Sequence, residues 1–277
     1  MRHGEGGQLN INRSLLSLLL FWQLISFSCA IFAQDNTRFV AIVMDDLGNN
    51  LPVGKELIHM PYDITYSFLP HTTYSLPLSK LALKHNKELM LHLPMQPLNN
   101  KVMGPGGLYD NMDQRNFLTT LRHDMKAIPG VIGINNHMGS LLTQNSQKMQ
   151  WLMEELKSNK NLYFVDSKTH ALSVAAKQAR AYRVPNTSRD IFLDHVVNKI
   201  DIDYQFERLI KRIDKVGYAL AIGHPHKETI KALKFWLPKL EKAGVRIVSV
   251  SHYIQLIESR RLLWQASLSR SHKVVKN

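Results

Sequence analysis

Five strand-like runs of apolar residues each end at an acidic or imidazole side chain. These residues are Asp45 with Asp46, His92, His137, Asp166 and His224. Continuous apolar runs are typical of buried parallel strands, and α/β enzymes carry their chemistry at the carboxyl ends of such strands. If the runs share one sheet, carboxylate oxygens and imidazole nitrogens meet at one edge, and zinc and similar ions bind these ligands. The pattern predicts a metal site.

Asp46, His92 and His137 are the residues that we expect to bind the metal ion. One carboxylate and two imidazoles leave an open coordination position for water, as a hydrolytic metal site requires. Asp45 precedes Asp46 directly and is expected to accept a proton as the catalytic base. Structural roles stay open for all four, because an aspartate at this position can form a turn or cap a helix, and a single histidine is often a hydrogen-bonded structural residue.

His224 ends a late apolar run, and histidine is suited to act as a general acid near neutral pH, although a structural role is the alternative. Three further residues are predicted to bind substrate: Asp166, Arg189 and Asp194. The two aspartates also end strand-like runs, where they would hold sugar hydroxyls or orient a histidine. Arg189 would pair with a nearby carboxylate.

Apolar spacing alternates between strand and helix patterns after Gln34. The expected strands cover residues 39–45, 63–69, 88–93, 131–136, 162–166, 191–194, 218–223 and 245–250. Between them apolar residues recur at helical spacing, as in Leu152, Met153 and Leu156, which indicates amphipathic helices and βαβ units in a parallel sheet. Seven or eight such units favour a distorted (β/α) barrel. An open doubly wound sheet is the alternative, although no dinucleotide-binding Gly-x-Gly-x-x-Gly follows the first strand.

Three segments fall outside the strand–helix pattern. Residues 1–33 combine two arginines with a long apolar stretch, which is the form of a cleaved signal peptide. An uncleaved anchor is the alternative. With either one, we expect the chain to be exported to the periplasm or cell envelope. Within the predicted domain, residues 34–258, the insert 96–111 could line a cleft or form a plain surface loop. Residues 259–277 are basic and lack periodicity, so we expect them to be poorly ordered.

Charge and cysteine content narrow the possible partners. The formal net charge is +13 at pH 7, which favours anionic partners such as acidic glycans, membrane headgroups or nucleic acid. A solvated surface with a basic tail is the alternative that we prefer, because the basic residues are scattered except after Ser259. Nucleic acid is not an expected partner of an exported chain without a basic-aromatic stripe, and membrane contact is expected only through residues 1–33 if they stay uncleaved. Cys29 is the only cysteine, so neither disulfides nor thiolate ligands belong to the mature domain.

Five segments closely resemble the divergent polysaccharide deacetylase family, a branch of the NodB-like carbohydrate esterases. They are residues 43–48 (Val-Met-Asp-Asp-Leu-Gly), 91–95 (Leu-His-Leu-Pro-Met), 133–140 (Gly-Ile-Asn-Asn-His-Met-Gly-Ser), 164–167 (Phe-Val-Asp-Ser) and 221–226 (Ala-Ile-Gly-His-Pro-His). The resemblance covers residues 38–255 in the expected order. It implies a distorted (β/α) barrel, a location in the cell envelope and a carbohydrate substrate.

The resemblance also implies a mechanism. Asp46 and two histidines would hold a divalent ion, with Zn²⁺ the expected metal, and Asp45 would act as base on the bound water that attacks an N-acetyl carbonyl. His224 would then protonate the leaving amine.

The sequence departs from the typical family motifs at two places. Typical deacetylases have two histidines one helical turn apart in their second motif, whereas Leu141 stands at that spacing after His137. The second imidazole is therefore assigned to His92. The arginine-containing third motif is absent as well, and Arg189 is the residue that would replace it in space.

The predicted function is metal-dependent removal of acetyl groups from an envelope polysaccharide such as peptidoglycan. The alternative is a catalytically inactive protein that binds glycan, or another envelope component, on the same barrel. An O-acetyl esterase is a broader third option.

Overall fold

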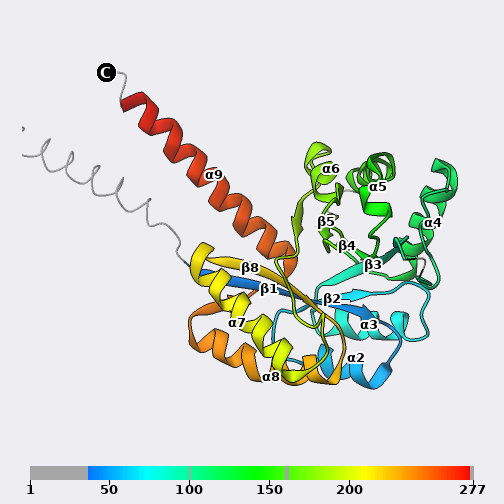
Figure 1. Ribbon diagram of the computed structural model, residues 1–277, viewed down its shortest axis with the longest axis horizontal. Helices are drawn as coiled ribbons and strands as arrows, with labels where there is room; N and C mark the ends of the chain where they lie inside the picture. Colours follow the sequence, from blue (N-terminus) through cyan, green and yellow to red (C-terminus); the bar gives the residue numbers. More distant parts are fainter. Residues whose placement is uncertain (1–36, 100, 160–161, 275–277) are drawn as a thin grey trace, which may run out of the picture. The chain divides into compact units, whose positions relative to one another are not determined.

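The computed structural model describes residues 37–99, 101–159 and 162–274. Within these residues the strands form one curled parallel sheet, and helices that connect successive strands pack against it (Figure 1). The predicted signal segment, residues 1–33, lies outside the described residues, so cleavage and anchoring both stay predictions. None of the described helices combines the length and the apolar character that a bilayer span needs.

The sheet follows the expected strand pattern closely. The strands are β1 (Arg38–Leu47), β2 (Thr65–Phe68), β3 (Leu89–Met95), β4 (Gly133–Met138), β5 (Tyr163–Asp166), β6 (Asn186–Ser188), β7 (Ile191–Phe192), β8 (Tyr218–Gly223) and β9 (Val245–Ile247). Their order is β6-β5-β4-β3-β2-β1-β8-β7, and β9 also pairs with β1. Each registered pair is parallel, so the carboxyl ends of the strands lie at one rim.

One short segment, residues 186–192, connects the two edges of the sheet. Its first part, β6, pairs with β5, and its last part, β7, pairs with β8. Between them the backbone N–H of Arg189 donates to the carbonyl of Asp166 at 3.0 Å, and that of Asp190 donates to the carbonyl of Leu220 at 2.9 Å. The chain thus crosses from one edge strand to the other, and the predicted distorted barrel is confirmed in place of an open doubly wound sheet.

Most of the helices pack against the outer face of this sheet, and the last one begins at its interior. The helices are α2 (Leu51–Ile58), α3 (Ser75–Lys84), α4 (Gln114–Ala127), the 3₁₀ helix η2 (Leu142–Gln144), α5 (Ser146–Ser158), α6 (Ala175–Ala181), α7 (Lys199–Val216), α8 (Lys227–Lys242) and α9 (Val250–Val274). Several begin at a side chain that accepts a hydrogen bond from the first turn, as the carboxylate of Asp113 does for α4 and the amide oxygen of Asn198 for α7. α7 ends at Gly217, whose φ of +88° lies in the left-handed region that favours glycine.

Alternation along the strands separates an outer apolar layer from an inner one. The even-numbered residues from Val40 to Met44 pack in the cluster shared with the helices, and the odd-numbered residues from Phe39 to Val43 pack in a second cluster. This second cluster draws its members from the strands, from Val248 and from the start of α9, so it is the interior of the curled sheet. Because successive side chains point to opposite faces, the residue two places after an interior residue is also interior.

The insert after β3 is attached to the rim. The N–H of Leu108 donates to the carbonyl of Pro94 at 2.9 Å, and the N–H of Gln96 donates to the carbonyl of Leu108 at 3.0 Å. The side chain of Gln96 accepts a bond from the N–H of Asp110, and Leu108 is fully buried. The far part of the predicted loop 96–111 therefore folds back onto β3 and forms part of the wall beside the carboxyl ends.

The last helix differs from the expectation for residues 259–277. α9 continues to Val274 rather than losing structure after Ser259. Residues 250–274 contain no glycine or proline and include several strong helix formers, which outweigh the missing apolar periodicity. The beginning of α9 is attached to the domain by Tyr253 and Ile254, which are buried in the interior cluster. The expected final strand, 245–250, is correspondingly shorter, because Val250 begins the helix.

Candidate metal centre

A β-bulge in β1 brings two adjacent aspartates to the same rim. The pairing of β1 with β2 shifts its register between Met44 and Leu47, and Asp46 has a φ of +56°. Aspartate is among the few non-glycine residues that adopt this left-handed conformation with some frequency. On a regular strand Asp45 would face the interior and Asp46 the helices. The bulge turns the Asp46 carboxylate back toward the rim.

Three candidate ligand atoms form a compact triangle. Asp46 Oδ1 lies 3.0 Å from His137 Nδ1 and 3.2 Å from His92 Nε2, and these two nitrogens lie 3.2 Å apart. Ligand atoms around tetrahedral zinc, at bond lengths of about 2.0–2.1 Å, are separated by roughly 3.3 Å. The structure therefore brings together the three predicted metal ligands in the spacing of one shared cation.

The charge and burial of Asp46 also fit a cation at this place. Asp46 Oδ1 is buried and has no hydrogen-bond partner, although a buried carboxylate oxygen needs compensation. Burial disfavours the charge, but the neighbouring imidazoles of His137 and His92 outweigh this effect and hold the pKa of the Asp46 carboxyl well below its usual range. The Asp46 carboxylate oxygen thus faces two imidazole nitrogens, as three ligands of one shared cation would.

Asn135 orients His92 and was not predicted as a functional residue. Its side-chain oxygen accepts a hydrogen bond from His92 Nδ1 at 2.8 Å, which leaves Nε2 free to face Asp46. The same oxygen accepts from the hydroxyl of Ser67 at 2.6 Å. The available sequence signal was that Asn135 is a polar residue at the end of an apolar run. Its position in the interior register of β4 directs its side chain toward the candidate site.

The amide of Asn135 also holds Asp45. Its Nδ2 donates to both carboxylate oxygens of Asp45, at 2.8 and 3.0 Å. Asp45 is only 2% exposed, and His92 Nδ1 lies 3.6 Å from its Oδ1. Burial is the largest influence and raises the pKa of Asp45, against the opposing effects of His92 and His224. Asp45 is therefore a desolvated carboxylate next to the candidate ligands.

His224 is held at the opposite side of Asp46 by a buried aspartate. Asp194 Oδ1 accepts from His224 Nδ1 at 2.9 Å, and Asp194 Oδ2 accepts from the His224 backbone N–H at 2.6 Å and from the hydroxyl of Thr229 at 2.8 Å. His224 Nε2 then faces Asp46 Oδ2 at 3.9 Å. Burial lowers the pKa of His224, but the hydrogen bond and charge of Asp194, with Asp45 and Asp46, raise it overall to about 9.

The residues predicted to bind substrate have structural partners. Asp166 lies on the outward register of β5 and accepts bonds from the Lys168 N–H and the Ser173 hydroxyl, both at 2.9 Å. Arg189 donates to the carbonyls of Ser167 and Lys168, at 2.7 and 2.9 Å, rather than pairing directly with a carboxylate. Together with Asp194, which holds His224, these residues shape the rim. Contact with substrate stays a prediction for all three.

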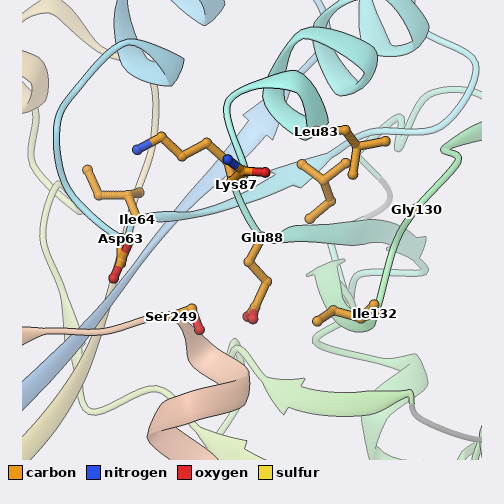
Figure 2. A pocket seen from close by; sticks show the side chains of 10 residues that line it. Asp63, Ile64, Leu83, Lys87, Glu88, Gly130, Ile132 and Ser249 are labelled. Carbon is orange, nitrogen blue, oxygen red and sulfur yellow. The ribbon is translucent and has the colours of Figure 1, made fainter.

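A cavity of about 450 Å³ lies at the other end of the strands (Figure 2). Its lining includes Ile64 and Glu88, which precede β2 and β3, and so it is separate from the metal centre. Two of its charged groups already have partners: Glu88 accepts from the hydroxyls of Thr65, Tyr163 and Ser251, and Lys87 donates to two backbone carbonyls. These contacts connect β2, β3, β5 and α9 at this end of the sheet.

Asn135→Ala tests the orienting role of this amide. We expect zinc affinity to fall by about 10–100-fold, because His92 loses the acceptor that fixes its ring and Asp45 loses both hydrogen bonds. Competition with a coloured zinc chelator measures the affinity. Ser67→Ala is the matched control: it removes one bond to the same amide oxygen and should cost less. Unchanged affinity in Asn135→Ala would show that His92 needs no such partner.

The fold and the rim together define an α/β barrel protein with one carboxylate and two imidazoles grouped at the rim, where they could hold a metal ion. The chain belongs to the divergent polysaccharide deacetylase family, whose model matches residues 42–254. It is 33% identical over 244 residues to an uncharacterized protein of Haemophilus influenzae, covering 88% of this chain and 80% of that one. It is also 33% identical over 218 residues to the uncharacterized protein YibQ of Escherichia coli, covering 79% and 67% of the two chains.

Solved structures share the fold at low sequence identity. The crystal structure of the uncharacterized protein ATU2773 from Agrobacterium tumefaciens has a TM-score of 0.75 at 22% identity, covering 80% of this chain and 91% of that chain. A lactam utilization protein from Thermus thermophilus has a TM-score of 0.55 at 13% identity, covering 76% and 99%. These similarities support the barrel architecture and carry no conclusion about activity.

Proposed function

We propose that this protein is a metal-dependent deacetylase that acts on N-acetylated sugars of an envelope polysaccharide such as peptidoglycan. The triangle of Asp46, His92 and His137 is the observation that carries the proposal, since its spacing and its unpartnered carboxylate oxygen suit a divalent cation. The donor set of one carboxylate and two imidazoles favours zinc and leaves a coordination position open. Membership of the deacetylase family supports the reaction class.

A bound divalent ion would supply Lewis acidity, polarising the acetyl carbonyl and lowering the pKa of a water molecule. Asp45 is the base that accepts the proton of the attacking water. Its burial raises the pKa of the carboxyl, which makes its carboxylate a better base than an exposed one. The two hydrogen bonds from Asn135 keep this carboxylate in place while it changes protonation state.

His224 is the acid that completes the reaction. Its Nδ1 is engaged by Asp194, so the proton it transfers is the one on Nε2, the nitrogen that faces the rim. The C–N bond of the acetamide breaks as this proton passes to the nitrogen of the leaving amine. The products are acetate and the free amino sugar, and the proton held by Asp45 restores the imidazolium through solvent.

The substrate and the location belong to the same proposal. The apolar stretch within residues 1–33 supports export, and an exported deacetylase meets the polysaccharides of the periplasm and cell envelope. The net charge of +13 favours an anionic polymer such as peptidoglycan over a neutral one.

Release of acetate tests the proposed function. The full chain loaded with zinc is incubated with peptidoglycan fragments, and acetate is measured for the parent and for Asp45→Asn. We expect Asp45→Asn to lower the rate by about 10²–10⁴-fold, because an asparagine cannot accept the proton. Its zinc content should equal that of the parent, since Asp45 is not one of the three ligands.

Two results would contradict the proposal. Equal rates in parent and variant would exclude Asp45 as the base. Binding of glycan by the zinc-loaded parent without any release of acetate would favour the non-catalytic alternative. O-acetylated fragments in the same assay distinguish an esterase from an amidase.

A further inference from the structure

A second group of two imidazoles and a carboxylate lies away from the residues of the metal centre. His71 belongs to the loop between β2 and α3, and His123 and Asp124 belong to the last turn of α4. His71 Nε2 lies 2.8 Å from Asp124 Oδ1. The imidazole rings of His71 and His123 stack with centroids 4.4 Å apart and planes inclined by 19°. The group joins two successive β/α units.

Asp124 is a costly residue at its position unless a cation compensates it. The residue is fully buried, and its Oδ2 has no hydrogen-bond partner. It also stands in the last turn of α4, where the partial negative charge of the helix end disfavours a carboxylate. A buried carboxylate oxygen without a partner destabilises the folded chain.

The backbone around Asp124 leaves its carboxylate little room to turn away. Gly106 has a φ of +79°, and a Cβ atom at this glycine would lie 2.3 Å from Asp124 Oδ1. The loop after β3 thus covers the carboxylate from one side, and the two histidines flank it on another. The remaining direction is toward the imidazoles, of which His123 is exposed to solvent.

We propose that His71, His123 and Asp124 bind a second divalent transition-metal ion, of the zinc class. The donor set is again one carboxylate and two imidazoles, and the exposure of His123 leaves room for exchangeable water as a further ligand. Candidate ligand atoms of the three residues lie within 4.8 Å of one another. Tetrahedral zinc needs ligand atoms roughly 3.3 Å apart, and the exposed side chain of His123 is the one that would have to move to reach this spacing.

Two comparisons within the chain show what distinguishes this group. Asp194, His224 and His226 are also close together, but both oxygens of Asp194 already accept hydrogen bonds. His59 and His85 are another pair of exposed imidazoles in contact, with ring centroids 4.7 Å apart, and no described carboxylate joins them in a three-residue group. The group of Asp124 combines both requirements, an unpartnered buried oxygen and two adjacent imidazoles.

The bound ion would tie the loop after β2, which carries His71, to α4, which carries His123 and Asp124, and would stabilise the folded chain.

Zinc content measures the second site directly. The full chain, purified in detergent, is dialysed against Zn²⁺, and bound zinc is determined by elemental analysis. We expect two zinc ions in the parent and one in His123→Ala, a change at an exposed position that leaves the core intact. The double variant Asp46→Asn with His137→Ala should also hold one ion, bound at His71, His123 and Asp124. The combination of all three substitutions should hold none.

The matched control is His59→Ala with His85→Ala, which removes two exposed, contacting imidazoles and should leave two ions bound. Asp124→Asn is a second test that preserves shape while removing the charge, and it should hold one ion. The proposal is overturned if the parent binds a single ion, or if His123→Ala and Asp124→Asn bind as many ions as the parent. These counts do not depend on catalysis, and an inactive protein that binds two ions would contradict only the proposed function.

Discussion

Asp46→Asn is expected to abolish zinc binding at the metal centre and, with it, release of acetate. The substitution preserves the shape of the side chain but removes the only negative charge among the three ligands, beside two neutral imidazoles. Loss of an outer hydrogen-bond partner costs roughly 10–100-fold in metal affinity, and loss of a direct, charged ligand should exceed that range. Competition titration with a zinc chelator measures the affinity, and the acetate assay measures activity.

The neighbouring residue supplies the control for this experiment. Asp45→Asn makes the same chemical change one position earlier in the chain and should inactivate without loss of zinc affinity. A parallel pair is His137→Ala, which removes a ligand, and His226→Ala, which removes an exposed imidazole outside the triangle. If Asp46→Asn retained the zinc affinity of the parent, the triangle would not be the metal centre.

The overall fold could be predicted from the sequence because its signals are local and repeated. The buried strands appear as apolar runs, as from Phe39 to Met44, and the helices between them have apolar faces at regular spacing. The prediction of secondary structure failed where the strand is too short to show a pattern, as in β6, and where helix propensity alone decides, as in the second half of α9. β6 has only three half-buried polar residues, Asn186–Ser188, and its position follows from pairing with β5 rather than from its own composition.

The histidines of the candidate site could also be predicted, because they stand within or directly after a strand, in the register of the barrel interior. His92 stands two residues after Met90 and His224 two residues after Ile222, both members of the interior cluster. Asp46 breaks this rule and reaches the rim only through the bulge in β1. Alternation alone would have placed it among the helices, and the bulge has no clear sequence signal other than two adjacent aspartates.

The partners of these residues were harder to predict, since they depend on contacts between distant segments. Asn135 contacts Asp45, which lies 90 positions earlier in the chain, and also His92. Asp194 contacts His224, 30 positions later. A single sequence reports neither pairing. Asp166 shows a different failure. Its position at a strand end suggested a role at the rim, but its side chain faces outward, as that of Phe164 does, and accepts a hydrogen bond from the N–H of Lys168 in the following turn.

His224→Ala is expected to lower the turnover rate by about 10²–10⁴-fold while zinc stays bound, because the leaving amine loses its proton donor. Asp194→Asn should act on the same step more weakly, through the ionisation of the imidazole. Burial lowers the pKa of His224, but the hydrogen bond and the charge of Asp194 outweigh burial and raise this pKa to about 9. An ordinary histidine has a pKa of about 6.5. The acid form is therefore present at neutral pH and is lost as the pH rises through about 9.

The sign of the effect in Asp194→Asn follows from this shift. Removing the carboxylate charge lowers the pKa of His224, so the imidazolium is lost at a lower pH and the alkaline limb of the rate profile moves toward neutrality. NMR titration of His224 in the metal-free chain measures the same pKa without catalysis, in the parent and in Asp194→Asn. Thr229→Ala is the control, because it removes a neutral partner of Asp194 and leaves the charge beside His224 in place. An alkaline limb at the same pH in the parent and in Asp194→Asn would mean that His224 is not the acid whose ionisation limits the reaction.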